Sequence, residues 1–122
     1  MILVIGGAGQ GKLDYVLEKT GFGPTDVAHD PEEAKAKPIF DGLEAWVKGH
    51  TEETLEDLLG ANPGVILLCD EVGCGVVPMD KNERIWREAV GRLCCSLAQR
   101  AERVERVFCG LSTVLKGDGA WK

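Results

Sequence analysis

Residues 2–12 of the chain read Ile2-Leu3-Val4-Ile5-Gly6-Gly7-Ala8-Gly9-Gln10-Gly11-Lys12. The first four form an apolar run without alternating polar residues, which is typical of a strand buried on both faces of a parallel sheet. The next seven match the pattern G-x-x-x-x-G-K, and a helix is predicted from Lys12 to Lys19. A glycine loop between a buried strand and a helix indicates an α/β fold with a phosphate-binding loop.

The residue types in this loop suit a nucleotide. Glycine lets the backbone turn so that successive N–H groups converge on a phosphate. The start of the helix adds partial positive charge, and Lys12 is expected to bridge the terminal phosphates. The alternative is a tight strand-to-helix turn with a solvent-exposed lysine, which this context disfavours. The predicted nucleotide-binding residues are Gly6, Gly7, Ala8, Gly9, Gln10, Gly11, Lys12 and Leu13.

Leu13 departs from the motif, which has Ser or Thr there to place a hydroxyl on Mg²⁺. A leucine cannot bind the ion, but Mg²⁺ usually keeps several waters, and one of them could take this position. The sequence therefore predicts weakened catalysis rather than lost binding. Asp41 and Asp70 each follow an apolar stretch, and we expect them to orient the metal or its water; a solvated carboxylate is the alternative for each.

The rest of the chain alternates strands and helices. Further strands are predicted near 27–28, 38–41, 65–69 and 107–109, with helices over 51–60 and after Asp80, and the tail is expected to be only partly ordered. The long helix carries an apolar stripe at Trp86, Val90, Leu93, Leu97, Ala101 and Val104. This order predicts a single three-layer α/β domain over residues 1–122, with a mostly parallel sheet.

Composition narrows the function classes. The 122 residues include 14 basic and 20 acidic side chains, a net charge of −6, which disfavours non-specific nucleic-acid binding. No apolar run approaches the roughly 20 residues that span a bilayer, and no secretory leader is evident. Five cysteines without C-x-x-C spacing suggest neither a disulfide framework nor a zinc site, so we expect a cytoplasmic protein.

A second segment gives the sequence a family resemblance. The string Glu71-Val72-Gly73-Cys74-Gly75-Val76-Val77-Pro78 resembles E-V-G-x-G-x-V-P of the adenosylcobinamide kinase/adenosylcobinamide-phosphate guanylyltransferase family. The resemblance continues through Arg84 and Arg87 towards Lys116. Upstream, residues 41–46 are similar to the family's D-C-L-T-x-W segment, and the glycine loop is similar to its G-G-A-x-S-G-K-S start, apart from Gln10 and Leu13.

The resemblance implies a P-loop fold and an enzyme that phosphorylates cobinamide with GTP or ATP and Mg²⁺. The expected catalytic residues are Lys12, Asp41 and Glu71, with Arg84 and Arg87 on one helix face as phosphate or substrate contacts. The implied partners are a nucleotide and a corrinoid small molecule, and a homo-oligomer is left open.

The chain also departs from the family. The stretch that carries the family's guanylylated histidine is shortened, and neither His29 nor His50 matches it, so guanylyl transfer is not expected. Cys94-Cys95 replaces the family's N-Q. A catalytically degenerate nucleotide-binding module, regulatory or a partner subunit, is the alternative function, and an unrelated P-loop kinase is a weaker one.

Overall fold

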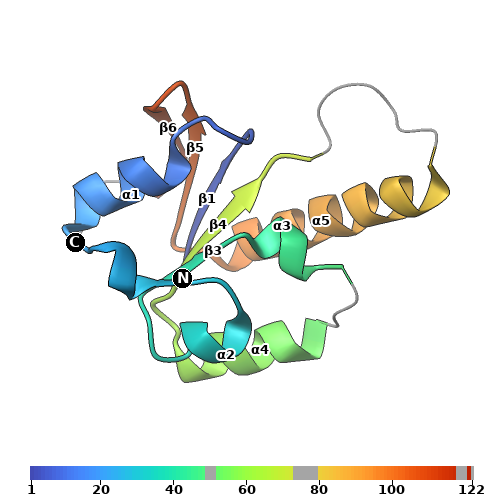
Figure 1. The fold of residues 1–122 in the computed structure, drawn as a ribbon, viewed down its shortest axis with the longest axis horizontal. Helices are drawn as coiled ribbons and strands as arrows, with labels where there is room; N and C mark the ends of the chain where they lie inside the picture. Colours follow the sequence, from blue (N-terminus) through green and yellow to red (C-terminus); the bar gives the residue numbers. More distant parts are fainter. Residues whose placement is uncertain (49–51, 73–79, 118–120, 122) are drawn as a thin grey trace.

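A single six-stranded sheet organises the computed structural model, which describes residues 1–48, 52–72, 80–117 and 121 (Figure 1). The strand order is β2-β3-β4-β1-β5-β6, and all neighbouring pairs run parallel except β5 and β6. The strands are β1 (Ile2–Gly6), β2 (Val27–Ala28), β3 (Ile39–Asp41), β4 (Ile66–Asp70), β5 (Arg103–Phe108) and β6 (Leu111–Lys116). The predicted mostly parallel α/β architecture is confirmed.

The helices lie between the strands, as the sequence pattern predicts. They are α1 (Lys12–Thr20), α2 (Pro31–Ala34), α3 (Leu43–Trp46), α4 (Glu52–Ala61) and α5 (Lys81–Arg100), with a 3₁₀ turn over Pro24–Asp26. Asp80 caps α5, because its carboxylate accepts hydrogen bonds from the backbone N–H groups of Asn82 and Glu83. The first residue of the helix predicted over 51–60, and residues 73–78 of the string that resembles the family, lie outside the described residues.

Two hydrophobic cores make the fold three-layered. On one face of the sheet, α1 packs through Val16 against Val4, Leu68 and Val107. On the other face, the remaining helices cover Leu3, Leu67 and neighbouring residues of the same strands. Figure 1 shows α1 on one side of the sheet and α3, α4 and α5 on the other. Because successive strand residues point to opposite faces, the uninterrupted apolar runs of β1 and β4 serve both cores.

The carboxyl-terminal region differs from the prediction. The apolar stripe was expected to continue through Ala101 and Val104, but α5 ends at Arg100 and Val104 lies in β5. The final strand starts at residue 103 rather than 107, and it is followed by the antiparallel strand β6, where the sequence predicts a partly ordered tail. Cys109 and Gly110 both have positive φ, 53° and 74°, and form the two-residue turn of this hairpin.

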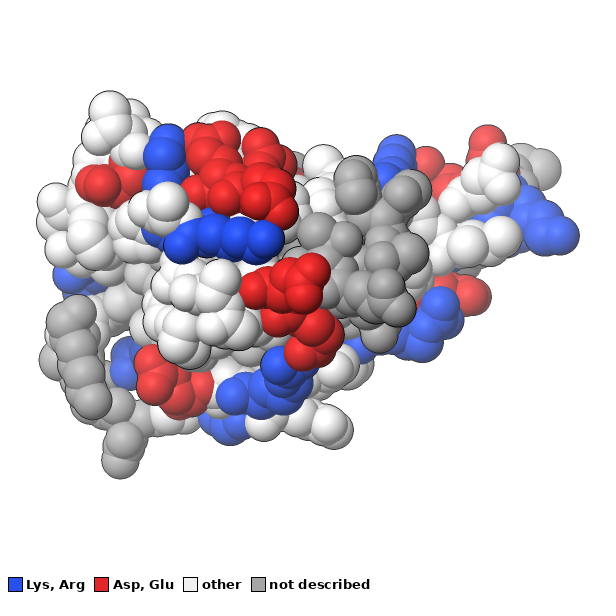
Figure 2. Space-filling view, turned by 90° about the horizontal axis from the view of Figure 1, so that it is seen from below, with Lys and Arg blue, Asp and Glu red and all other residues white. Residues whose placement is uncertain are grey.

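Several charged side chains on the surface pair with near neighbours in the sequence. Lys35 contacts Glu32 at 2.8 Å and Lys37 contacts Glu33 at 2.7 Å, both around α2. Figure 2 shows acidic and basic side chains next to one another over the face that it presents. No helix within the described ranges combines the length and the apolar character needed to cross a membrane.

Candidate functional site

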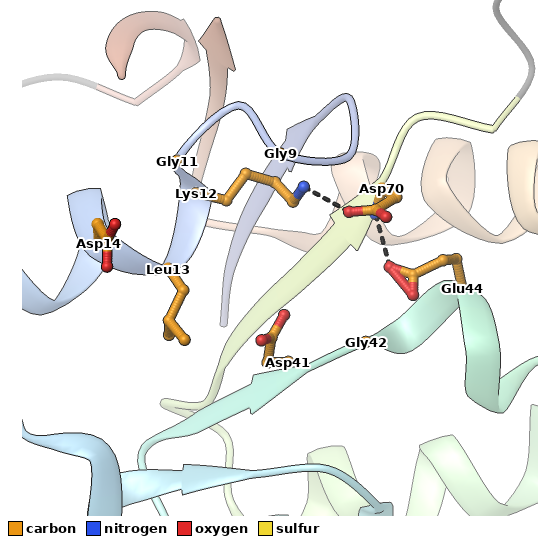
Figure 3. Close-up of a pocket in the computed structure, with 9 residues that line it drawn as sticks. All are labelled: Gly9, Gly11, Lys12, Leu13, Asp14, Asp41, Gly42, Glu44 and Asp70. Atoms are coloured by element: carbon orange, nitrogen blue, oxygen red, sulfur yellow. Dashed lines mark hydrogen bonds and ion pairs between the residues drawn. The ribbon is translucent and has the colours of Figure 1, made fainter. Parts of the chain in front are cut away.

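A cavity of about 380 Å³ opens at the carboxyl ends of β1, β3 and β4. The chain leaves β1 towards α1 on one face of the sheet, and leaves β4 towards α5 on the other face. Ligands of open α/β sheets bind where the connections of neighbouring strands diverge in this way. The cavity is lined by Gly9, Gly11, Lys12, Leu13, Asp14, Asp41, Gly42, Glu44 and Asp70 (Figure 3).

The glycine loop joins β1 to α1, and two of its residues need glycine for backbone conformation. Gly9 has φ 74° and Gly11, which precedes the first residue of α1, has φ 90°. Both values lie in the left-handed region, which side chains with a Cβ atom rarely adopt. Gly6 meets a different constraint, because a Cβ atom there would lie 2.4 Å from the carbonyl oxygen of Val107. The glycine pattern thus reflects backbone geometry at three separate points.

The β5–β6 turn holds the loop from outside the cavity. The backbone N–H of Cys109 donates to the side-chain Oε1 of Gln10 at 2.7 Å, and the N–H of Gly110 donates to the Gln10 carbonyl at 2.8 Å. Gln10, one of the two loop positions that depart from the family pattern, therefore anchors the loop to a hairpin that the sequence reading did not predict.

Lys12 is buried and turns back across the loop. Its Nζ donates to the carbonyl oxygens of Gly6 and Gly7, each at 3.1 Å, and forms an ion pair with Asp70 (Figure 3). The side chain is only 7% exposed. The lysine therefore carries its positive charge at the carboxyl ends of β1 and β4, at the wall of the cavity, rather than extending into solvent as the alternative reading required.

Glu44 is the site residue that the sequence reading missed. Its Oε1 accepts a hydrogen bond from the backbone N–H of Asp70 at 2.8 Å, and Oε2 accepts one from the N–H of Ala45 at 3.0 Å. Glu44 is 9% exposed although it is charged. In the sequence, Glu44 could have been singled out as a lone carboxylate within the apolar segment from Leu43 to Trp46. Buried charged side chains are rare unless they are paired or hydrogen-bonded, so such a residue indicates a specific contact.

The two predicted metal-binding carboxylates line the same cavity. Asp41 ends β3 and Asp70 ends the neighbouring strand β4. Among the described residues, no group of three or more His, Cys, Asp or Glu side chains is arranged to hold a metal ion by itself. Mg²⁺ is commonly held by one or two carboxylates with waters and substrate phosphates, so the donor set fits this ion when phosphates complete it. Leu13 lines the cavity and supplies no ligand.

Other predicted residues lie outside the cavity. Glu71 follows Asp70, but its two carboxylate oxygens accept hydrogen bonds from Arg106 at 2.9 and 3.0 Å. Arg84 and Arg87 lie in the first two turns of α5 and do not line the cavity, and the Nε of Arg87 is 3.9 Å from Glu83. The structure thus groups Lys12, Asp41 and Asp70, and leaves these three residues apart from them.

A second hollow of about 450 Å³ adjoins the first, because Gly42 lines both. His29, which is exposed and follows β2, lines this second hollow together with Asp30 and Trp46. His50 lies outside the described residues. His29 therefore lies at the same edge of the sheet as the glycine loop.

Comparison with known proteins identifies the family. The model of the cobinamide kinase / cobinamide phosphate guanyltransferase family matches residues 25–115, about three-quarters of the chain. The chain belongs to this family. The match includes Asp41, Glu44 and Asp70, whereas the glycine loop of this family member precedes the matched stretch, so the loop is supported by its own sequence and geometry.

A curated relative supports the same family. The bifunctional adenosylcobalamin biosynthesis protein CobP of Pseudomonas aeruginosa is 40% identical over 67 residues. This stretch is 54% of the present chain and 39% of the Pseudomonas protein. The cobinamide kinase / guanyltransferase member described here therefore aligns with well under half the length of that relative.

Proposed function

We propose that this protein transfers the γ-phosphate of GTP or ATP to the hydroxyl group of a cobinamide, as a step in cobalamin biosynthesis. The observation that carries the proposal is the cavity in which the glycine loop and Lys12 meet Asp41 and Asp70. Family membership supplies the acceptor, because the family description names cobinamide as the kinase substrate. Nothing in the proposal requires guanylyl transfer.

Phosphoryl transfer depends mainly on positioning and on neutralising charge. In the proposed reaction, the loop from Gly6 to Gly11 holds the phosphates with its backbone N–H groups, and the start of α1 adds a favourable partial charge. Lys12 leaves its contacts with the Gly6 and Gly7 carbonyls and donates to the terminal phosphate oxygens. Asp41 lines the same cavity, and we assign it the role of orienting the acceptor hydroxyl.

Asp41 and Asp70 are the residues that would hold Mg²⁺. The ion, when bound with the nucleotide, neutralises charge on the phosphates. Two contacts orient Asp70 for this role. The Lys12 ammonium pairs with the Asp70 carboxylate, and the Glu44 carboxylate accepts a hydrogen bond from the Asp70 backbone N–H. Arg84, Arg87 and Glu71 would act on the substrate only if α5 or the chain after β4 approached the cavity on binding.

The alternative is a nucleotide-binding module without catalysis, regulatory or part of a complex. The observation that favours it is Leu13, which faces the cavity where a hydroxyl ligand for Mg²⁺ is expected. Both functions predict nucleotide binding through Lys12, so only turnover separates them.

We also infer that the chain acts as one nucleotide-binding domain in the cytoplasm and forms a homo-oligomer through the β5–β6 hairpin. Phe108 is 62% exposed and Leu111 is 75% exposed, and they lie opposite each other in the hairpin whose second strand, β6, is the outer strand of the sheet among the described residues. Exposed apolar edge strands are prone to pair with another chain. Light scattering of the wild type and of Phe108→Ser/Leu111→Ser tests this, and a monomeric wild type contradicts it.

The deciding experiment is titration of the full chain with fluorescent GTP and ATP, with and without Mg²⁺. Lys12→Ala should abolish binding, whereas Lys19→Ala, an exposed lysine in the last turn of the same helix, should leave it intact. Incubation with cobinamide and γ-labelled nucleotide then distinguishes the enzyme from the module. Failure of the wild type to bind either nucleotide would exclude both.

A further inference from the structure

Two thiols meet directly behind the proposed nucleotide site. Cys69, the penultimate residue of β4, has its Sγ 3.5 Å from the Sγ of Cys94 in the fourth turn of α5. The residues are 25 positions apart, so only the packing of α5 on the sheet brings them together. Both belong to the core on that face. In the sequence, Cys94 is notable only because Cys94-Cys95 replaces the family's N-Q.

The two sulfur atoms lie close enough to form a disulfide after a small movement. A disulfide has an S–S distance of about 2.05 Å, so the sulfurs need to approach by about 1.5 Å. Cys69 is fully buried, whereas Cys94 is half-buried on the solvent side of the pair. A small oxidant can therefore reach Cys94 first, and Cys69 is placed to complete the bond.

The position of Cys69 links the pair to the site. The next residue is Asp70, whose N–H is bound by Glu44 and whose carboxylate pairs with Lys12. The Cys69 Sγ itself donates to the carbonyl oxygen of Asp70 at 3.6 Å. Because protein interiors are close-packed, drawing the Cys69 side chain towards α5 shifts the end of β4 instead of being absorbed locally.

We propose that Cys69 and Cys94 form a reversible disulfide on oxidation by a peroxide, and that this bond weakens nucleotide binding at the Asp70 site. The regulatory half rests on the proposed function. The Cys94 thiolate attacks one peroxide oxygen, giving a sulfenic acid and hydroxide. Cys69 then attacks the Cys94 sulfur and releases the sulfenic oxygen as water. In sum, two thiols and one hydrogen peroxide give one disulfide and two waters.

The test treats the folded full chain with hydrogen peroxide and maps disulfides by mass spectrometry. A loss of about 2 Da per chain and a peptide joining Cys69 to Cys94 are expected, both reversed by dithiothreitol. Fluorescent GTP affinity should fall about fivefold or more in the oxidised wild type. Cys94→Ser should bind GTP as tightly as the reduced wild type, and peroxide should not change its affinity. The matched variant Cys95→Ser, at the exposed neighbouring position, should lose affinity on oxidation as the wild type does.

The outcomes of this test distinguish disulfide formation, the covalent half of the proposal, from its effect on nucleotide binding, the regulatory half. A map without the Cys69–Cys94 peptide, or one showing only links between chains, overturns the proposal. A link that leaves GTP affinity unchanged overturns its regulatory half. If the reduced wild type binds no nucleotide, the proposed function and the regulatory half both fail, while the peptide map still decides the covalent half.

Discussion

The Glu44 carboxylate accepts the backbone N–H of Asp70 at 2.8 Å, which joins the start of α3 to the end of β4. Asp70 contacts Lys12 through its side chain, so one residue is held from two sides by groups of opposite charge. Glu44 in turn is fixed by Trp86 of α5, whose indole N–H donates to the Glu44 carbonyl at 2.7 Å. The cavity wall therefore depends on a contact between elements that are distant in sequence.

Glu44→Ala should destabilise the protein, because it removes the acceptor for the Asp70 N–H. The expected loss in the free energy of unfolding is about 1–3 kcal/mol, measured by urea denaturation. Glu44→Gln keeps an oxygen acceptor and should lose less. Glu18→Ala, an exposed position on α1, serves as the control. Equal losses in the alanine and glutamine variants would show that the hydrogen bond is not what Glu44 contributes.

Leu13→Ser should restore a hydroxyl at the position that faces the cavity. If Leu13 limits catalysis, the serine variant should transfer phosphate to cobinamide faster than Leu13→Ala by on the order of 10²-fold, the typical worth of one positioned transition-state contact. The alanine variant controls for the lost apolar packing against the α1 core. Identical rates in the two variants, measured with labelled GTP and Mg²⁺, would mean that the metal is held without this position.

Gly6→Ala should destabilise the protein although it adds only one methyl group, because the new Cβ would lie 2.4 Å from the Val107 carbonyl oxygen in β5. The backbones of β1 and β5 must separate, so we expect a loss of about 1–3 kcal/mol and weaker nucleotide binding. Gly91→Ala is the matched comparison, because Gly91 lies inside α5 with open space around it. That change should stabilise the protein by about 0.5–1 kcal/mol. Unfolding of both variants in urea checks the contrast.

A buried carboxylate on the α1 face of the sheet gives the protein a pH dependence. Glu105 is 1% exposed and accepts hydrogen bonds from Arg103 at 2.6 Å, from Ser112 and from Tyr15. Burial alone would raise the pKa of Glu105, but the hydrogen bonds from Arg103, Ser112 and Tyr15 outweigh burial and lower this pKa below the usual 4.5. Glu105 is thus ionised in the folded protein at neutral pH.

Because the folded-state pKa of Glu105 is lowered, its ionisation stabilises the fold fully above pH 4.5, and this contribution is lost as pH falls through the lowered value. Glu105→Gln should cost about 1–3 kcal/mol at pH 7, since it removes the charged acceptor of the hydrogen bonds from Arg103, Ser112 and Tyr15, and it should flatten the decline below pH 4.5. Urea unfolding from pH 3 to 7 measures both effects. Glu102→Gln, at an exposed position, should behave as the wild type, and an equally steep decline in Glu105→Gln would contradict the assignment.

Much of the fold followed from local patterns. The apolar runs at β1 and β4, the glycine loop and the start of the helix after Asp80 are each encoded within a few residues, so they could be predicted. The carboxyl-terminal region could not, because the helical period of apolar residues continues past Arg100 into β5. Val104 fits either pattern, and only pairing with β1 selects the strand.

The candidate site also combines features that local sequence predicts with features that depend on tertiary packing. The phosphate-binding loop that we propose is predicted from consecutive residues, because glycine dihedral preferences and one lysine define such a loop locally. Which carboxylates face that loop was decided by the order of strands in the sheet, which brings Asp41 and Asp70 together, turns Glu71 towards Arg106 and places Glu44 against the Asp70 backbone. The sequence alone predicted a glycine loop between a strand and a helix, because dihedral preferences are local. The charged residues around the loop, and the contact between Cys69 and Cys94, depend on tertiary packing. Residues that are distant in the sequence come into contact only when the helices pack on the sheet.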